Sequence, residues 1–359
     1  MKNNEINELY NSIQNINIFE SDKWLHDFNF ISASIGTLLP KLSFNEHLKI
    51  AKKSAFYQIL SSRDERNYDL IRQIKKIDFN LKKRILVTFH YSSYRLLNSL
   101  LISWSVPFKL VADDNYIKKQ GDSTIESYNK IAKELGVKAY DFEIINAEER
   151  TVIFKCLKAI NEGYSLVFYA DGNSGIGGMT KNQKNIIKIP FLESSLYVRK
   201  GIAVIASLLK VPICVILLKR NILTDSVEIF CEEDIDFPEN RKDENDLKAC
   251  TINIFENLEK RLSEDPGQWE GWFYYHNFIE FSQNKPKGNY GSTSIFNNRF
   301  YGVGKLSGIF YILDKNTLKL IPISEEVYLE LLNIIKHNKI EKDFPLLKSL
   351  KKEKIIINI

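Results

Sequence analysis

Short apolar runs alternate with segments of helical spacing over the middle of this chain. From residue 83 to about residue 280, each apolar run predicts a strand, and each stretch with apolar residues three and four positions apart predicts a helix. The predicted strands cover 84–90, 108–112, 137–143, 165–170, 211–218 and 226–231, and the predicted helices cover 93–103, 123–135, 148–162, 196–209 and 244–264. This alternation predicts an α/β fold with a central, mostly parallel sheet flanked by helices.

The two ends of the chain have different patterns. Residues 1–80 have helical spacing, and Ser43 with Glu46 forms a capping-box pattern that predicts a helix to about Leu60. The later segments predict a Gly- and Pro-rich linker at 282–298, a hairpin at 309–323, a helix at 325–335 and a short strand at 355–357. We therefore expect an N-terminal helical region at 1–80, an α/β core at 81–283 and a small α+β C-terminal module at 299–359.

Composition and charge narrow the class of partner. Hydrophobic residues make up 44% of the 359 residues and charged residues 26%, which is typical of a globular protein. The net charge of +5 is too small to argue for nucleic acid, and no nucleic-acid-binding motif is present. It suits an anionic partner such as a phosphopantetheine carrier, a coenzyme A ester or an acidic membrane surface.

The four cysteines and the N-terminus indicate in which cellular compartment the protein is expected. Cys156, Cys214, Cys231 and Cys250 form no CxxC pair, and their spacing matches neither a zinc site nor a disulfide framework. The polar N-terminus lacks the apolar stretch of a signal peptide, and no apolar run reaches the ~18 residues of a membrane-spanning helix. We expect a cytoplasmic protein, and peripheral contact with the inner membrane face stays open.

Two predicted strands end in residues that could do chemistry. The run 85–89 ends at His90, and the run 166–170 ends at Asp171, just before a glycine-rich loop. Ligands of parallel α/β sheets bind beyond the carboxyl ends of the strands, so one cleft is expected to hold both side chains. There His90 can act as a general base. Alternatively His90 caps or packs, and Asp171 makes a turn.

Three later segments complete a recognisable order of motifs. Pro190-Phe191 precedes a helix, Val211-Pro212 opens a strand, and Pro266-Gly267-Gln268-Trp269 stands three residues before Trp272. Together with His90 and Asp171, this order resembles the late acyltransferases of lipid A biosynthesis, the lauroyl and myristoyl transferases. They are a branch of the lysophospholipid acyltransferase superfamily. The resemblance covers about residues 25–280.

The resemblance implies a glycerolipid acyltransferase-like fold and an enzyme that moves a fatty acyl group. The donor would be an acyl thioester of acyl carrier protein or coenzyme A. The acceptor would be a hydroxyl or amine, in a peptide or a small molecule. The resemblance implies no cofactor and no metal. His90 would be the catalytic base. The implied substrate-binding residues are Tyr91, Ser92, Ser93, Asn173, Phe191, Trp269 and Trp272.

The chain departs from the family at one position. Arg95 stands five residues after His90, where the family has an Asp or Glu that orients the histidine. A guanidinium cannot accept the imidazole proton. Asp171 is the first candidate replacement, followed by Asp113 and Asp114. Arg95 itself could stabilise the oxyanion, contact a donor phosphate or lie on the surface.

The missing acid keeps a second function open. A non-catalytic protein that binds an acyl carrier or a peptide on an acyltransferase scaffold would also lack it. The C-terminal module is similar to small leader-binding segments of peptide-maturation enzymes, which suggests a peptide or carrier partner. The other interpretation is an accessory subdomain that covers apolar surface through Leu331 and Ile335.

Overall fold

The computed structural model describes residues 3–172, 184–281, 294–337, 340, 344 and 346–358. Asn173 and nearly all of the glycine-rich loop lie outside the described residues, as does most of the predicted linker. The chain folds into two compact units. The first comprises Met1–Ile13, Lys53–Phe191 and Leu196–Gly271, and the second comprises Gln14–Lys52, Leu192–Ser195 and Trp272–Ile359. The predicted division into 1–80, 81–283 and 299–359 stays a prediction.

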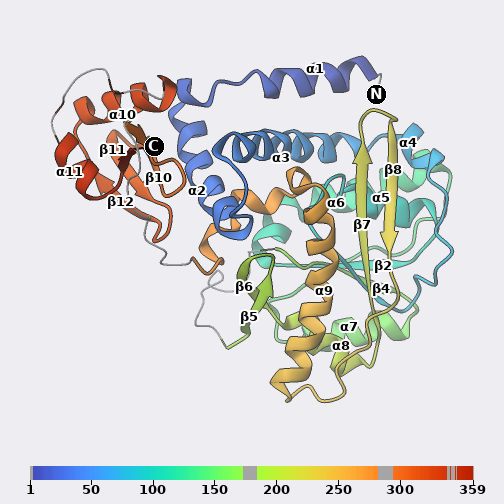
Figure 1. The fold of residues 1–359 in the computed structure, drawn as a ribbon. Helices are drawn as coiled ribbons and strands as arrows, with labels where there is room; N and C mark the ends of the chain where they lie inside the picture. Colours follow the sequence, from blue (N-terminus) through green and yellow to red (C-terminus); the bar gives the residue numbers. More distant parts are fainter. Residues whose placement is uncertain are drawn as a thin grey trace. The chain divides into compact units, whose positions relative to one another are not determined.

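A six-stranded sheet forms the centre of the first unit (Figure 1). Its strands, in spatial order, are β3 (Ile144–Asn146), β2 (Phe108–Ala112), β4 (Ser165–Tyr169), β1 (Ile85–Thr88), β7 (Ile213–Asn221) and β8 (Ser226–Cys231). All neighbours pair in parallel except β7 and β8. The predicted α/β class with a mostly parallel sheet is therefore confirmed. A separate hairpin joins β5 (Ile186–Phe191) to β6 (Ser194–Arg199).

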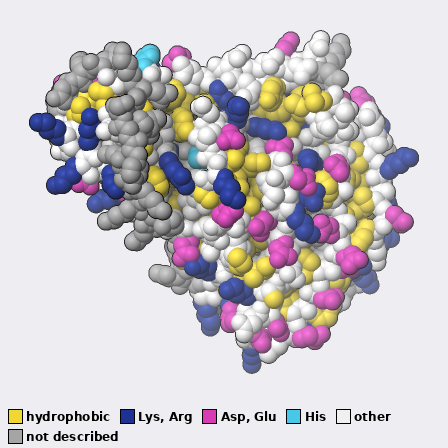
Figure 2. Space-filling model, in the orientation of Figure 1, with side chains coloured by type: hydrophobic (Ala, Val, Ile, Leu, Met, Phe, Trp, Pro, Cys, Tyr) yellow, Lys and Arg dark blue, Asp and Glu magenta, His cyan; other side chains and the backbone are white. Residues whose placement is uncertain are grey.

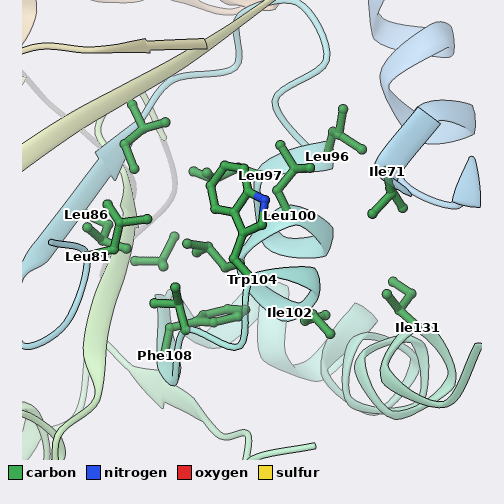
Figure 3. Close-up of a cluster of buried hydrophobic side chains, with 14 of the residues drawn as sticks. Ile71, Leu81, Leu86, Leu96, Leu97, Leu100, Ile102, Trp104, Phe108 and Ile131 are labelled. Atoms are coloured by element: carbon green, nitrogen blue, oxygen red, sulfur yellow. The ribbon is translucent and has the colours of Figure 1, made fainter. Parts of the chain in front are cut away.

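Helices flank this sheet, as predicted. They are α5 (Leu96–Ser103), α6 (Asp114–Leu135), α7 (Val152–Asn161), α8 (Gly201–Leu209) and α9 (Glu244–Glu264). The helices α1 (Asn3–Gln14), α3 (Phe44–Asp64) and α4 (Tyr68–Gln73) come before the first strand in the chain. One apolar cluster joins Leu86 of β1 to Leu97 and Leu100 of α5 and to Trp104 and Phe108 (Figure 3). This burial stabilises the strand that leads to His90.

The second unit combines segments from both ends of the chain. Its elements are α2 (Asp22–Leu38), the sheet β10 (Tyr301–Leu306), β11 (Ile309–Asp314) and β12 (Lys319–Pro322), the pair β9 (Ser294–Phe296) and β13 (Ile356–Asn358), and helices α10 (Glu325–His337) and α11 (Leu347–Lys352). Its short 3-10 helices lie at Ile18–Glu20 and Tyr275–Asn277; Pro266–Gln268 forms one in the first unit, and Glu270–Phe273 forms one at the residues where the chain passes from the first unit to the second. Asn29 of α2 donates to the Val303 carbonyl at 2.7 Å, and a Cβ at Gly302 would lie 2.2 Å from the Asn29 Oδ1. Glycine therefore lets α2 approach β10 closely.

Several predicted elements need correction. Residues 137–143 form no strand; the third parallel strand lies at 144–146, and Phe142 stacks on Tyr128 at 4.4 Å. The apolar pattern there reflects packing on α6 rather than pairing. The predicted helix 196–209 divides into β6 and α8, and residues 294–296 of the predicted linker form β9. The capping box is confirmed, since the Ser43 backbone N–H donates to Glu46 Oε2 at 2.7 Å.

Charged side chains of both signs are interspersed over the face shown in Figure 2. No helix among the described residues is long and apolar enough to cross a membrane.

Candidate functional site

Strand register brings His90 and Asp171 together. In the parallel pair of β1 and β4, Thr88 lies opposite Tyr169, and the pairing continues because the Ala170 N–H donates to the Thr88 carbonyl at 2.9 Å. Two residues beyond this register stand His90 and Asp171, at the carboxyl edge of the sheet where ligands of such folds bind. The His90 Nδ1 lies 2.8 Å from Asp171 Oδ1, which confirms the predicted proximity.

The Asp171 carboxylate is fully buried and held from three directions. The His90 backbone N–H lies 3.0 Å from each of its oxygens, and the Trp269 indole N–H donates to Oδ2 at 2.8 Å. Because an ionised carboxylate only accepts hydrogen bonds, the His90 Nδ1 must be the donor. This fixes the ring orientation and makes Nε2 the basic nitrogen of the neutral imidazole.

The electrostatics favour a chargeable imidazole. Burial by itself lowers the pKa of His90, but the charge of Asp171 and its hydrogen bond raise it, and the net pKa lies above the ordinary value of 6.5. The side chain of His90 remains 23% exposed, whereas that of Asp171 is 0% exposed. The pair therefore combines a reachable base with a buried anion that stabilises its protonated form.

The three residues after His90 are buried; the two serine hydroxyls bind protein groups, whereas the Tyr91 hydroxyl has no hydrogen-bond partner among the described residues. Tyr91, Ser92 and Ser93 are 0%, 2% and 0% exposed. Ser92 adopts a left-handed conformation with φ 55°, and its hydroxyl accepts the Arg220 N–H at 2.8 Å. With so little exposed surface, these residues shape the turn that carries His90, and their predicted contacts with substrate stay a prediction.

A buried ion pair anchors the same turn. The Ser93 hydroxyl donates to Asp64 Oδ2 at 2.5 Å, and Arg220 Nε donates to that oxygen at 3.1 Å. Arg220 also pairs with Asp225. Asp64 and Arg220 are 1% and 0% exposed. Their network joins α3, β7 and the His90 turn, and Asp64 and Arg220 carried no sequence motif that could have singled them out.

Two tyrosines and a glutamate surround the imidazole. The Tyr94 ring lies 4.7 Å from the His90 ring in an edge-on arrangement, and the Tyr169 ring lies 5.2 Å from it. The Tyr94 hydroxyl donates to Glu270 Oε2 at 3.0 Å, and the Glu270 N–H donates to the His90 carbonyl at 2.8 Å. Glu270 was not predicted, although it directly follows Trp269 in the last motif.

Arg95 does not take the place of the missing acid. Arg95 is the N-cap residue of α5, and its guanidinium carbon lies 5.2 Å from the Tyr94 ring centre. Asp113 caps α6 by accepting the Tyr116 N–H at 3.0 Å, and Asp114 pairs with Lys118 at 2.5 Å. Of the candidate acids, Asp171 is the one that hydrogen-bonds His90.

The remaining predicted site residues lie in different settings. Phe191 is 1% exposed, with its ring centre 6.1 Å from that of Trp269. Trp269 is buried and binds Asp171, so it positions the acid rather than lining a surface. Trp272 is buried in the second unit. Asn173 lies outside the described residues.

Comparison with known proteins names no relative. No protein-family model matches the chain, and no curated protein has a significantly similar sequence. Across residues 3–172, 184–281 and the other described positions, no cluster of His, Cys, Asp and Glu has the makeup of a metal site.

Proposed function

We propose that this protein is an acyltransferase of the lysophospholipid acyltransferase type, with His90 and Asp171 as its catalytic pair. The observation that carries the proposal is the 2.8 Å bond between His90 Nδ1 and a fully buried Asp171 at the carboxyl edge of a parallel sheet. A partly exposed histidine backed by a buried carboxylate is the arrangement that general-base catalysis requires.

The proposed reaction transfers an acyl group from a thioester of acyl carrier protein or coenzyme A to a hydroxyl or amine. The acceptor attacks the thioester carbonyl carbon while Nε2 of His90 takes its proton. The tetrahedral intermediate then expels the thiolate as the C–S bond breaks, and the imidazolium returns the proton to the sulfur. Asp171 stabilises the imidazolium between these two steps.

In this proposal Asp171 supplies what the family acid supplies elsewhere. The acid usually follows the histidine on the helix, where this chain has Arg95; here it comes from the neighbouring strand. The proposal includes the cytoplasmic location that the sequence led us to expect. The C-terminal module, with eleven Lys and Arg against seven Asp and Glu in residues 299–359, suits an acidic carrier or peptide.

The test is thioester turnover by matched variants. With acyl-coenzyme A and acyl carrier donors, His90→Ala and Asp171→Asn should each lower the release of free thiol by about 10²–10⁴-fold. Asp113→Asn is the control, since it changes a carboxyl at the same sheet edge and Asn caps helices as well as Asp. Wild-type turnover by His90→Ala would refute the proposal.

The alternative is a non-catalytic protein that binds an acyl carrier or a peptide. The replacement of the family acid by Arg95 favours it. Wild-type protein that binds acyl carrier protein but releases no thiol with any donor would support this alternative over catalysis.

A further inference from the structure

Arg95 lies over the Tyr94 ring near His90 and pairs with no carboxylate among the described residues. Its Nε is buried without a hydrogen-bond partner, and no ion pair joins its guanidinium to a described carboxylate. The charges of Glu65 and Glu270 help to raise the pKa of Arg95, but neither carboxylate forms an ion pair with it. Nearby groups offset the cost of burial and raise the pKa of Arg95, but its Nε–H still has no acceptor, so the guanidinium has hydrogen-bonding capacity left for a ligand.

A second unpartnered polar atom lies on the same face of α5. Asn98 is three residues after Arg95, so the two side chains are neighbours on the helix. The Asn98 amide N–H donates to the Tyr169 hydroxyl at 3.3 Å, while its Oδ1 is buried with no partner. The opposite face of α5 buries Leu96, Leu97 and Leu100 in the core (Figure 3), which fixes the helix rotation.

Two tyrosines connect these groups to His90. Tyr94 contacts the His90 ring at 4.7 Å and has the Arg95 guanidinium at 5.2 Å from its ring centre. Tyr169 contacts the His90 ring at 5.2 Å and binds Asn98 through its hydroxyl. Tyr94 thus contacts both Arg95 and the His90 ring, and Tyr169 contacts both Asn98 and the His90 ring.

We infer that Arg95 and Asn98 form a recognition subsite for an acceptor that carries a carboxylate or phosphate near its nucleophilic amine or hydroxyl. Arg95 would bind the anion through guanidinium N–H groups, and Asn98 Oδ1 would accept an N–H or O–H of the same molecule. With the anion held there, the acceptor's nucleophile would be presented to His90. The inference rests on the proposed function for the acceptor's role, but the binding site is tested separately.

The first experiment measures anion binding without catalysis. Inorganic phosphate and acetate are titrated while the ring signals of the five histidines are followed by NMR. The His90 signal should shift saturably in the wild type, and Arg95→Gln should weaken this binding by about tenfold or more. Arg63→Gln, an exposed arginine of the first unit, is the control and should bind as the wild type does. Unchanged binding by Arg95→Gln, or no shift in the wild type, would overturn the inference.

The second experiment compares acceptors. With an acyl-coenzyme A donor, glycine should have a lower KM than glycinamide, and Arg95→Gln should raise the KM for glycine only, with partial rescue in Arg95→Lys. An equal fall in kcat with both acceptors would assign Arg95 to the oxyanion and overturn the inference. If Arg95→Gln lost activity with coenzyme A thioesters but not with phosphate-free thioesters, Arg95 would bind the donor, which would also overturn the inference. If the wild type releases no thiol at all, the proposed function fails, while the NMR titration still decides the subsite.

Discussion

At the scale of single residues, the candidate site depends on a histidine and an aspartate that follow two adjacent strands. His90 takes its orientation and its raised pKa from Asp171, which is 81 positions away in sequence. Trp269 and the His90 backbone N–H hold the Asp171 carboxylate against Nδ1 of His90, and the carboxylate has no contact with solvent. The imidazole is therefore both oriented and easier to protonate.

This arrangement predicts a particular pH dependence. A base must be neutral to act, so turnover by the wild type should rise with pH through the pKa of His90, above 6.5. Asp171→Asn removes the charge that raises this pKa, so the midpoint of its residual activity should move to lower pH. The measurement is the pH profile of thioester turnover at saturating donor. A midpoint that stays in place in Asp171→Asn would mean that another group sets it.

A second residue-scale prediction concerns Lys315 in the second unit. Its ammonium is buried and donates to Ser32 Oγ and to the Asn298 carbonyl, each at 2.7 Å, and Ser32 Oγ also lies 2.9 Å from His47 Nδ1. Burial lowers the pKa of Lys315 from 10.5 to about 7, and that of His47 to about 3. His47 is therefore neutral throughout the range in which Lys315 titrates.

Above its folded pKa, Lys315 is neutral in the folded protein but still charged in the unfolded chain. The unfolded state then binds the extra proton, so the free energy of unfolding should rise with pH between about 7 and 10.5, by up to about 1.4 kcal/mol per pH unit. Urea unfolding of the wild type and Lys315→Met at several pH values in this window checks it. Parallel curves for the two proteins would contradict the prediction.

At the scale of elements, the turn after β1 is held by a buried ion pair rather than by its own sequence. Arg220 on β7 and Asp64 on α3 are both inaccessible to solvent, and they bind Ser92 and Ser93 on either side. The left-handed conformation of Ser92 persists because these bonds determine it.

Removing one member of that pair should be strongly destabilising. Arg220→Met leaves the Asp64 charge buried without its cation, which costs about 3–5 kcal/mol of unfolding free energy. Lys219→Met is the control on the same strand: its exposed pair with Glu264 contributes about 0–1 kcal/mol. Denaturant melts of both variants test this, and equal losses would show that burial of the pair does not matter.

At the scale of the whole molecule, the second unit is built from segments far apart in sequence. Besides the Asn29 bond to β10, His26 Nδ1 lies 2.6 Å from the Tyr311 hydroxyl, and Lys315 binds Ser32 of α2. Phe28 and Ile31 of α2 are 1% and 2% exposed. The C-terminal module is therefore part of the packing of α2.

Deleting the module should consequently disturb more than partner recognition. A chain of residues 1–290 would leave the buried face of α2 without β10, so we expect faster proteolysis within 22–38 and loss of helical signal. Limited proteolysis and circular dichroism measure both, with Asn29→Ala in the full chain as a milder comparison. A truncated chain that resists proteolysis like the full chain would instead support a separable recognition module.

Much of the local structure followed from the sequence. Apolar runs located the strands that lead to His90 and Asp171, because a strand buried on both faces must be apolar along its length. The Ser43 and Glu46 spacing located a helix start, since capping depends on neighbours three residues apart. The segment 137–143 was misassigned because apolar residues that pack on a helix look like a strand when only their order is known.

The partners of His90 and Asp171 follow from the tertiary structure. The sequence by itself determined an α/β sheet, with a histidine and an acid at two strand ends. That β1 and β4 are neighbours in register, and that Glu270 and Trp269 return to the turn after β1, both depend on contacts between distant segments. Such contacts are set by strand order and packing, which local spacing does not encode.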